Sequence, residues 1–511
     1  MSKFGKLVGF DAEKKQTTVR TEIIAGIVTF LAMCYILTVN PNQILYAGTF
    51  DPRWASIFMA TAFGAIIGTL LMAFLSKMPL AQASGMGLNS LVGTIVGGGV
   101  GAYSTYVFEF TIGQAFAMVL ISGIIFLVLS TLKIKGKSIR EAIFDGMPVA
   151  VRSAISVGIG LFIAFIGFQN AGVIVTNPYT QIGLVDFTNW GQQMIQWANG
   201  GSFGFAAKTA AVAIIGLILI TVLDKHKVKG SVIIGILGAT IVGIPLGVTN
   251  LDVVAGNVPG ISWKFWENFA DFFGGESSVF LSFTEVFSTG FPAGSLFTII
   301  MLIITMCMID MFDTMGTIVG CCGGNRILSD ENNKPHNYDK IMISDAVATC
   351  AGAMLGTSTV TTFVESGAGV SAGGRTGLTA FTTACMFFLA IFAMPLFAAI
   401  PGAATASALI YVGVLMMKNN IKSVDFSNAI NATTAFMTIV IMLLSYSITK
   451  GIGFGMIIYT VMSLISYIIS AIKYAVAKDK ENAEKPVWDI SVVAIIVTIL
   501  FAIYFFVPAV I

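Results

Sequence analysis

The sequence is poor in charged residues, and this excludes a soluble globular protein. Only 11% of the 511 residues are charged, against roughly 25% in soluble domains. The 28 Lys and Arg residues nearly balance the 26 Asp and Glu residues, so no basic surplus is left for nucleic acid. The two histidines and six cysteines form no C-x-x-C pair or other metal-ligand spacing, and we expect neither a metal nor a cofactor. No nucleophile–base pair appears in any apolar segment, so we predict that the chain is not an enzyme.

Apolar residues are abundant and lie in long runs. They make up 56% of the chain, enough for about fourteen transmembrane helices at about 20 residues each. We therefore predict an all-α, multi-pass protein of the cell membrane with fourteen spans. The predicted spans are 21–42, 54–77, 79–99, 110–132, 148–172, 205–223, 229–248, 294–320, 340–356, 357–375, 376–400, 402–417, 426–447 and 451–475. The stretch 487–511 is a further apolar segment that either spans the membrane or lies along its surface.

The positive charges predict the orientation, because cytoplasmic loops of membrane proteins collect Lys and Arg. With the N-terminus in the cytoplasm, 24 of the 28 basic residues fall on the inside. A miscounted span in the middle of the chain would scramble this distribution. On this topology, segments 173–204 and 261–290 lie outside the cell. The aromatic residues of 261–290 predict an interfacial anchor, with a binding surface as the alternative.

Two predicted spans, the third and the tenth, are too polar and too rich in glycine for lipid-facing helices. They resemble each other at Ser84-Gly85-Met86-Gly87 and Ser366-Gly367-Ala368-Gly369. Pro148 and Pro401 each open a later span, in the same order. These matches predict two repeats of seven spans, and because seven is odd the second repeat must be inverted. Inverted repeats with broken helices are typical of transporters that bind their substrate near the bilayer midplane.

The broken spans predict short strands followed by half-helices. Residues 357–364 are mostly β-branched or aromatic, which favours an extended backbone. A strand in hydrocarbon must be paired, and we expect 79–83 to be its partner. Ser84 and Ser366 are predicted N-caps, while Gly85 and Gly367 allow close approach of backbone or ligand. The alternative is a pair of re-entrant loops without a ligand.

Three carboxylates lie inside predicted spans, where ionisable residues are costly and typically functional. Asp310 and Asp313 are three residues apart on one helical face, and Glu365 directly precedes a half-helix. We expect at least one of the three to hold a proton at neutral pH, and we assign Asp310 and Glu365 to substrate or proton binding. Asp313 is equally well explained as a structural residue. Asp345, close to Lys340 in sequence, is expected at the membrane interface.

A carboxylate beside backbone N–H groups suits a small planar solute. Two adjacent N–H groups of a ligand can pair with one carboxylate, and Phe312 or Phe363 can cover a ring face. Asn89 is expected to face the same cavity, to bind ligand or to satisfy the broken backbone. A nucleobase fits this description better than an amino acid or a sugar, because the broken spans offer no basic residue and few hydroxyl-binding side chains.

Several long motifs resemble the azaguanine-permease-like branch of the nucleobase–cation symporters. They are EIIAGIVTFLAMCYILTVNP at 22–41, GMGLNS at 85–90, DMFDTMGT at 310–317 and GTSTVTTFVESGAGVSAGGRTGLTA at 356–380. The resemblance implies substrate-binding acids at Asp310 and Glu365, a second acid at Asp313 and a binding asparagine at Asn89. Other branches have a glutamate and a histidine in the eighth span, where this chain has two aspartates. This difference favours a purine permease and leaves the proton carrier unassigned.

The resemblance also implies a uracil-transporter-like fold in which a core domain moves against a gate domain. The implied parts are a cytoplasmic N-terminal segment (1–20), the core domain (21–137 and 294–400), the gate domain (138–260 and 401–475), an extracytoplasmic aromatic segment (261–293) and a C-terminal segment (476–511).

The expected function is proton-driven import of hypoxanthine, guanine or adenine, with Na⁺ as an alternative coupling ion. A carrier of the same fold for uracil, xanthine or another small anion is one rival, and an uncoupled channel or receptor is another. Whether the protein forms a homodimer is left open.

Overall fold

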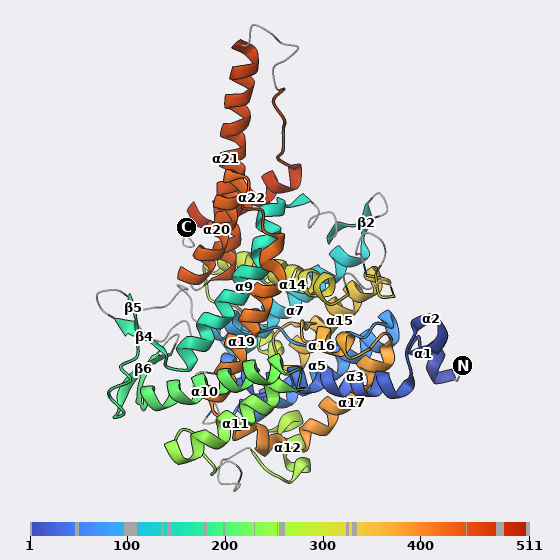
Figure 1. The fold of residues 1–511 in the computed structure, drawn as a ribbon, viewed down its shortest axis with the longest axis vertical. Coiled ribbons are helices and arrows are strands. Elements are labelled where there is room, and N and C mark those ends of the chain that lie inside the picture. Colours follow the sequence, from blue (N-terminus) through green and yellow to red (C-terminus); the bar gives the residue numbers. More distant parts are fainter. Residues whose placement is uncertain are drawn as a thin grey trace. The chain divides into compact units, whose positions relative to one another are not determined.

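The chain is mostly helical in the computed structural model (Figure 1). The structure describes residues 3–45, 51–96, 110–134, 137–140, 146–177, 181–197, 200–228, 230–252, 254, 261–322, 327–329, 335–445, 447–476 and 485–506. The chain forms two compact units, one of residues 1–131 and 163–412 and the other of residues 132–162 and 413–511. Residues 1–131 and 163–412, called unit 1 below, contain every predicted site residue. The predicted division into core and gate domains remains a prediction.

Helices lie in all the predicted spans. The helices of unit 1 are α1 (Lys3–Leu7), α2 (Ala12–Lys15), α3 (Val19–Met33), α4 (Ile36–Ile44), α5 (Trp54–Leu71) with its continuation η2 (Met72–Ser76), α6 (Met86–Val96), α7 (Ile112–Thr131), α10 (Ala206–Lys225), α11 (Ser231–Leu246), α12 (Phe265–Gly274), η3 (Ser282–Glu285), α13 (Val286–Thr289), α14 (Leu296–Cys322), α15 (Tyr338–Leu355), α16 (Ser366–Ser371), α17 (Gly377–Ile391) and α18 (Met394–Ala398). The other unit has η4 (Ile421–Ser423), α20 (Ala429–Leu444), α21 (Ile448–Val476) and α22 (Val492–Phe506), while α9 (Val149–Asn170) and α19 (Gly402–Asn420) belong partly to each.

Seven helical stretches of the described chain are long and apolar enough to cross a membrane. They are Val19–Ile44, Trp54–Ser76, Ile112–Thr131, Val149–Asn170, Ala206–Lys225, Leu296–Met315 and Lys450–Val476. The prediction of a multi-pass helical membrane protein is therefore confirmed. The count of fourteen crossings in two inverted repeats remains a prediction.

Helix starts follow the local sequence. Thr18 caps α3 by accepting a hydrogen bond from the Thr21 N–H at 3.2 Å, and Thr376 caps α17 through Leu378 N–H at 3.2 Å. Such caps satisfy N–H groups that the first helical turn leaves without a partner. As predicted, α9 and α19 begin directly after Pro148 and Pro401.

Helices from the two halves of the chain interleave within unit 1. α3 packs on α16 and α17, α5 on α15 and α17, and α7 on α14 and α15. Close packing is possible where a glycine removes a side chain: a Cβ on Gly352 of α15 would lie 2.6 Å from Val360 Cγ2. The strand that contains Val360 therefore lies directly against α15.

Strands are more numerous than the sequence predicted. Besides β1 (Gln82–Ser84) and β8 (Val360–Thr362), the chain forms three antiparallel hairpins outside the broken spans. These are β2 (Lys133–Ile134) with β3 (Lys137–Ser138), β4 (Ile174–Asn177) with β5 (Gln181–Leu184), and β6 (Gln193–Trp197) with β7 (Gly200–Gly204). The strands predicted in the third and tenth spans are thus present, and the three hairpins are additional to the prediction. Short alternating stretches such as QMIQW, which forms β6, favour hairpins.

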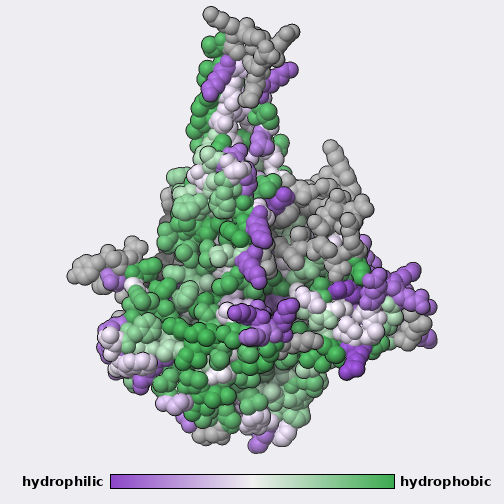
Figure 2. All heavy atoms as spheres, viewed as in Figure 1, coloured by the Kyte–Doolittle hydropathy of each residue, from purple (hydrophilic) through white to green (hydrophobic). Residues whose placement is uncertain are grey.

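Exposed hydrophobic side chains cover much of the viewed surface (Figure 2). On α10, Ile218 and Val222 are 55% and 48% exposed, and on α11 Ile241 is 65% exposed. Helices of a soluble protein would bury such faces. These faces are the surfaces expected to meet lipid.

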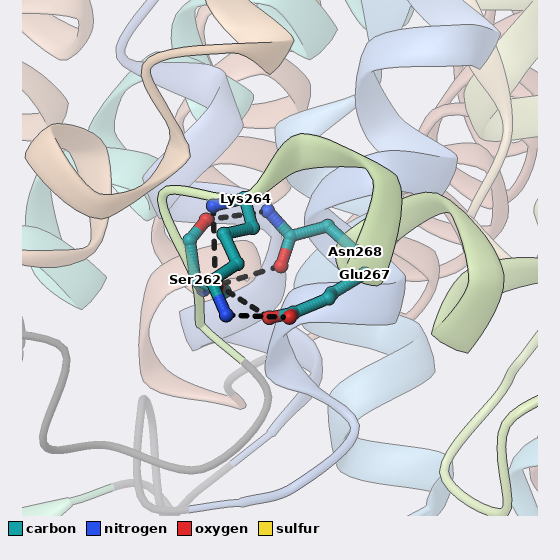
Figure 3. A network of polar contacts seen from close by, with 4 residues as sticks. All are labelled: Ser262, Lys264, Glu267 and Asn268. Atoms are coloured by element: carbon teal, nitrogen blue, oxygen red, sulfur yellow. Dashed lines mark hydrogen bonds and ion pairs between the residues drawn. The ribbon is translucent and has the colours of Figure 1, made fainter.

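The aromatic segment begins with a polar network at the start of α12 (Figure 3). Ser262 donates a hydrogen bond to Glu267 at 2.9 Å, and Lys264 forms an ion pair with Glu267 at 3.1 Å. The hydrogen bonds from Ser262 and Lys264 hold the pKa of Glu267 below its ordinary value. Phe272 packs against Phe63 of α5, with ring centroids 5.4 Å apart. The network holds the helix start in place, while Trp263 and Trp266, about half exposed, remain available for the predicted interfacial role.

Candidate functional site

The two broken spans meet as a pair of antiparallel strands. Gln82, Ala83 and Ser84 of β1 pair with Thr362, Thr361 and Val360 of β8. Backbone hydrogen bonds from Gly85 N–H to Thr359 and from Phe363 N–H to Ala81 extend the ladder at each end. The predicted pairing of the third and tenth spans is confirmed, although the β1 strand lies slightly later than the predicted 79–83. Each strand leads into a helix, α6 and α16.

The two serines do not cap these helices, and that prediction was wrong. The first turn of α6 instead hydrogen-bonds the Gly85 carbonyl, which accepts from Asn89 N–H at 2.8 Å. Ser84 Oγ lies 2.6 Å from Thr357 Oγ1, and Ser366 Oγ accepts from the Ala81 N–H at 3.0 Å. Both hydroxyls therefore join the two broken spans to each other. Among the described hydrogen bonds, neither hydroxyl accepts from an N–H of the helix that follows it, as an N-cap does.

Glu365 lies at the end of the β8 segment, directly before α16, and is 6% exposed. Tyr35, in the break between α3 and α4, donates a hydrogen bond to Glu365 Oε1 at 2.5 Å. The other oxygen, Oε2, is buried and has no hydrogen-bond partner among the described residues. A buried polar atom without a partner is costly, so Oε2 is a candidate acceptor for a ligand or the position of a bound proton.

Asp310 and Asp313 lie on α14 in different surroundings. Asp310 is completely buried and accepts a hydrogen bond from Thr349 of α15 at 2.9 Å. Asp313 is partly exposed and lies within electrostatic range of Asp345 and Glu365. The structure therefore brings Asp313 into electrostatic range of Glu365.

Asp345 is not at the interface, and the sequence-based expectation was wrong. Its side chain is completely buried. It accepts hydrogen bonds from Gln82 Nε2 at 2.9 Å and Thr314 Oγ1 at 2.7 Å, and a longer one from Thr362 at 3.3 Å. These donors come from β1, α14 and β8. Asp345 therefore ties the crossing strands to both α14 and α15.

The remaining predicted residues also lie at the strand crossing. Asn89 is completely buried, and its side-chain oxygen accepts a hydrogen bond from Ser358. Phe363 is 4% exposed. Gly367 donates its N–H to the Val364 carbonyl at 2.9 Å. The side chain of Phe312 lies outside the described part of the structure.

Asn40 belongs to the same site and was missed in the sequence. Its side-chain amide donates to Thr61 and Thr357, both at 2.7 Å, and lies 3.2 Å from Ser84 Oγ. It therefore connects α4, α5 and both broken spans. An amide in an otherwise apolar run, directly before Pro41, was the available signal.

The site is a mostly buried, acidic crossing of two chain breaks. Neither Glu365 nor Asp313 forms an ion pair with a described residue, and no group of three potential ligands suited to a metal ion occurs among the described residues. Buried carboxylates without a counter-charge attract a proton or a ligand that donates hydrogen bonds. The arrangement can therefore bind a small, uncharged solute with N–H donors.

Known proteins similar to this chain are permeases. The sequence model of the Permease family matches residues 20–454. The adenine permease AdeQ of Escherichia coli is 34% identical over 455 residues, which cover 89% of this chain and 90% of that protein. The guanine/hypoxanthine permease PbuO of Bacillus subtilis is 32% identical over 456 residues, which cover 89% of this chain and 93% of that protein. These relatives agree with the resemblance to purine permeases and not with an enzyme.

Solved structures share the fold at low sequence identity. The transmembrane domain of a cyanobacterium bicarbonate transporter, BicA, aligns with a TM-score of 0.56 at 16% identity, over 84% of this chain and 97% of that domain. The likeness extends to the fold and not to the solute.

Proposed function

The chain belongs to the permease family, and we propose that it is a secondary active transporter that imports purine nucleobases across the cell membrane by proton symport. Its relatives include permeases for adenine and for guanine and hypoxanthine, which supports one or more of these bases as substrate. The observation that carries the proposal is Glu365: a buried carboxylate at a chain break, with one oxygen left without a partner among the described residues.

In the proposed mechanism, Glu365 accepts a hydrogen bond from an N–H of the base. Asp310 contributes a second acidic group, and Asn89 and the Gly85 and Gly367 turns shape the site beside the base. One of Glu365, Asp310 and Asp313 carries the proton that accompanies the substrate. Binding a proton and a neutral base together leaves less uncompensated charge in the mostly buried site, because a lone buried carboxylate is costly. This cost couples the two events.

We further propose that substrate moves with a rigid core. The packing of α3 on α17, α5 on α15 and α7 on α14 joins the first to fourth and eighth to eleventh spans. In an inverted repeat the third and tenth spans would run in opposite directions. The antiparallel pairing of β1 with β8 supports this arrangement. Movement of this block against the remaining spans, as in an elevator, would carry the site from one side of the membrane to the other.

Uptake of labelled hypoxanthine, guanine and adenine by cells that lack their own purine permeases tests the function. We expect saturable uptake that falls when an uncoupler collapses the proton gradient and that unlabelled purines inhibit. Stronger inhibition by uracil or xanthine would instead favour the rival substrates. Uptake that ignores the uncoupler would contradict proton symport, and uptake that requires Na⁺ would change the coupling ion.

Glu365→Ala tests the site itself. The variant removes the buried acceptor, so we expect uptake to be abolished while the protein still reaches the membrane, as measured by immunoblotting of membrane fractions. Glu13→Ala is the matched control, because Glu13 is an exposed glutamate on α2. Uptake at the wild-type rate by the Glu365 variant would contradict the proposed site.

A further inference from the structure

Helix α3 holds the half-helix α16 at both of its ends. At one end, Tyr35, just beyond α3, donates a hydrogen bond to Glu365, which directly precedes α16. At the other end, Glu22, near the start of α3, binds the junction between α16 and α17. Between these contacts the two helices lie against each other, since a Cβ on Gly369 of α16 would overlap Thr29 Oγ1 of α3. Contacts with α3 therefore fix the segment that carries Glu365.

Glu22 is completely buried, and its carboxylate binds the start of α17. Oε1 accepts a hydrogen bond from Arg375 N–H at 3.0 Å. Oε2 accepts from Thr376 N–H at 3.3 Å and from the Thr379 hydroxyl at 2.5 Å. A carboxylate is favourable at a helix N-terminus, where N–H groups have no partner within the helix. Glu22 therefore fixes the position at which α17 begins.

Arg375 connects this anchor to α16. Its guanidinium donates hydrogen bonds to the carbonyls of Val370, in α16, and Gly374, at 2.6 Å and 2.8 Å. Its backbone N–H is the one that Glu22 holds. Because α16 is only six residues long, about two helical turns separate this end of the half-helix from Glu365. A shift at the junction is therefore transmitted to Glu365 over a short, regular element.

We propose that Glu22 is a positioning residue that keeps Glu365 in place for the base, acting through Arg375 and α16. The inference rests on the proposed function and adds to it a carboxylate that binds the protein backbone. A residue in this role should affect how tightly the base is bound, because a binding group must be held in its productive geometry by the residues behind it.

Glu22→Gln keeps the size of the side chain and replaces one acceptor oxygen with an NH2 group, so one of the two backbone N–H groups then faces another donor. Complete loss of the hydrogen bond between Glu365 and the base would cost about tenfold or more in affinity. We therefore expect the displaced Glu365 to raise the KM for uptake of labelled hypoxanthine at least about threefold, with Vmax per molecule in the membrane within about twofold of wild type. A purely structural role would lower the amount of protein in the membrane and leave the KM unchanged.

Arg375→Met is a second variant that leaves the contacts of Glu22 with the backbone in place. It removes only the guanidinium that binds the end of α16, and we expect it to raise the KM in the same way. Because it keeps the buried carboxylate satisfied, it also tests the inference if Glu22→Gln does not reach the membrane.

Asp425→Asn is the matched control. The Asp425 carboxylate accepts hydrogen bonds from Ser427 N–H at 2.9 Å and the Ser427 hydroxyl at 2.6 Å, ahead of α20 in the other unit. We expect this variant to keep the wild-type KM, because it loses a similar carboxylate contact that has no connection to α16.

A KM increase of less than about threefold in Arg375→Met, or in Glu22→Gln present in the membrane, would overturn the inference and leave purine transport intact. An equal increase in Asp425→Asn would overturn it as well. Absence of any purine uptake by the wild type would instead overturn the proposed function, and this inference with it.

Discussion

Asp310 and Asp313 are one helical turn apart, yet they differ in their hydrogen bonds. Asp310 is buried and tied to Thr349, whereas no hydrogen bond to the partly exposed Asp313 side chain is among those the structure describes. Thr349 also has an alternative acceptor, the Val360 carbonyl at 3.2 Å. Loss of the Asp310 charge therefore need not disrupt the packing of α14 on α15.

Asparagine substitutions distinguish charge from structure at these positions. Asp310→Asn can still accept the hydrogen bond from Thr349 but cannot carry a proton or a negative charge. We expect it to reduce uptake at least about tenfold without loss of protein from the membrane. Asp313→Asn should reduce uptake less, because it also relieves repulsion with Asp345 and Glu365. Near-normal uptake by Asp310→Asn would assign Asp310 a structural role, and a larger defect in Asp313→Asn would exchange the two assignments.

The sequence identified some of these residues and not others for physical reasons. A carboxylate in an apolar run is conspicuous, and Asp310, Asp313 and Glu365 were found in this way. Tyr35 was not, because tyrosine is common in membrane spans and nothing local indicates a partner 330 residues away. Asp345 was misjudged for the same reason, since its donor Gln82 is 263 residues distant.

At the scale of elements, the paired strands depend on a close approach at Gly85. A Cβ at this position would overlap Cγ2 of Thr361 on the opposite strand. The turn into α6 therefore requires glycine for space. The β-branched run 357–364 predicted an extended backbone, but only three of its residues pair as β8. The local sequence does not set the length of the paired region, because pairing register depends on contacts between distant segments.

Gly85→Ala is expected to destabilise the protein by about 1–3 kcal/mol, the usual cost of overpacking, and to reduce uptake. Thr361→Ser removes the obstructing methyl group and retains the hydroxyl, whose oxygen lies 2.9 Å from Thr314 Oγ1. We therefore expect Gly85→Ala with Thr361→Ser to recover most of the lost stability, measured as the Tm of the purified protein in detergent.

Gly402→Ala is the control for this cycle, because a Cβ at Gly402, the first residue of α19, meets no atom within 4 Å. Its Tm should stay near that of the wild type. If the double variant is as unstable as Gly85→Ala alone, the clash with Thr361 is not the cause, and the glycine requirement lies elsewhere in the turn.

At the scale of the whole molecule, helix positions were more predictable than topology. Each predicted span contains a helix or a strand–helix pair, since a run of apolar residues is a local property. The orientation of each span in the membrane depends on how Lys and Arg are distributed over all the loops. The position of a helix in the structure does not reveal which of its ends faces the cytoplasm. The predicted orientation, with the N-terminus in the cytoplasm, therefore needs a measurement that distinguishes the two sides of the membrane.

Residues that flank α10 provide this measurement. Thr188 precedes the helix and Lys227 follows it, and both are exposed. Because Lys225, Lys227 and Lys229 belong to the basic residues assigned to the inside, we expect Lys227→Cys to react with a membrane-impermeant maleimide only after permeabilisation. Thr188→Cys should react in intact cells, with both variants made in a background that lacks the six native cysteines. The opposite pattern would reverse the orientation of the chain, and labelling of both positions from one side would show that α10 does not cross the membrane.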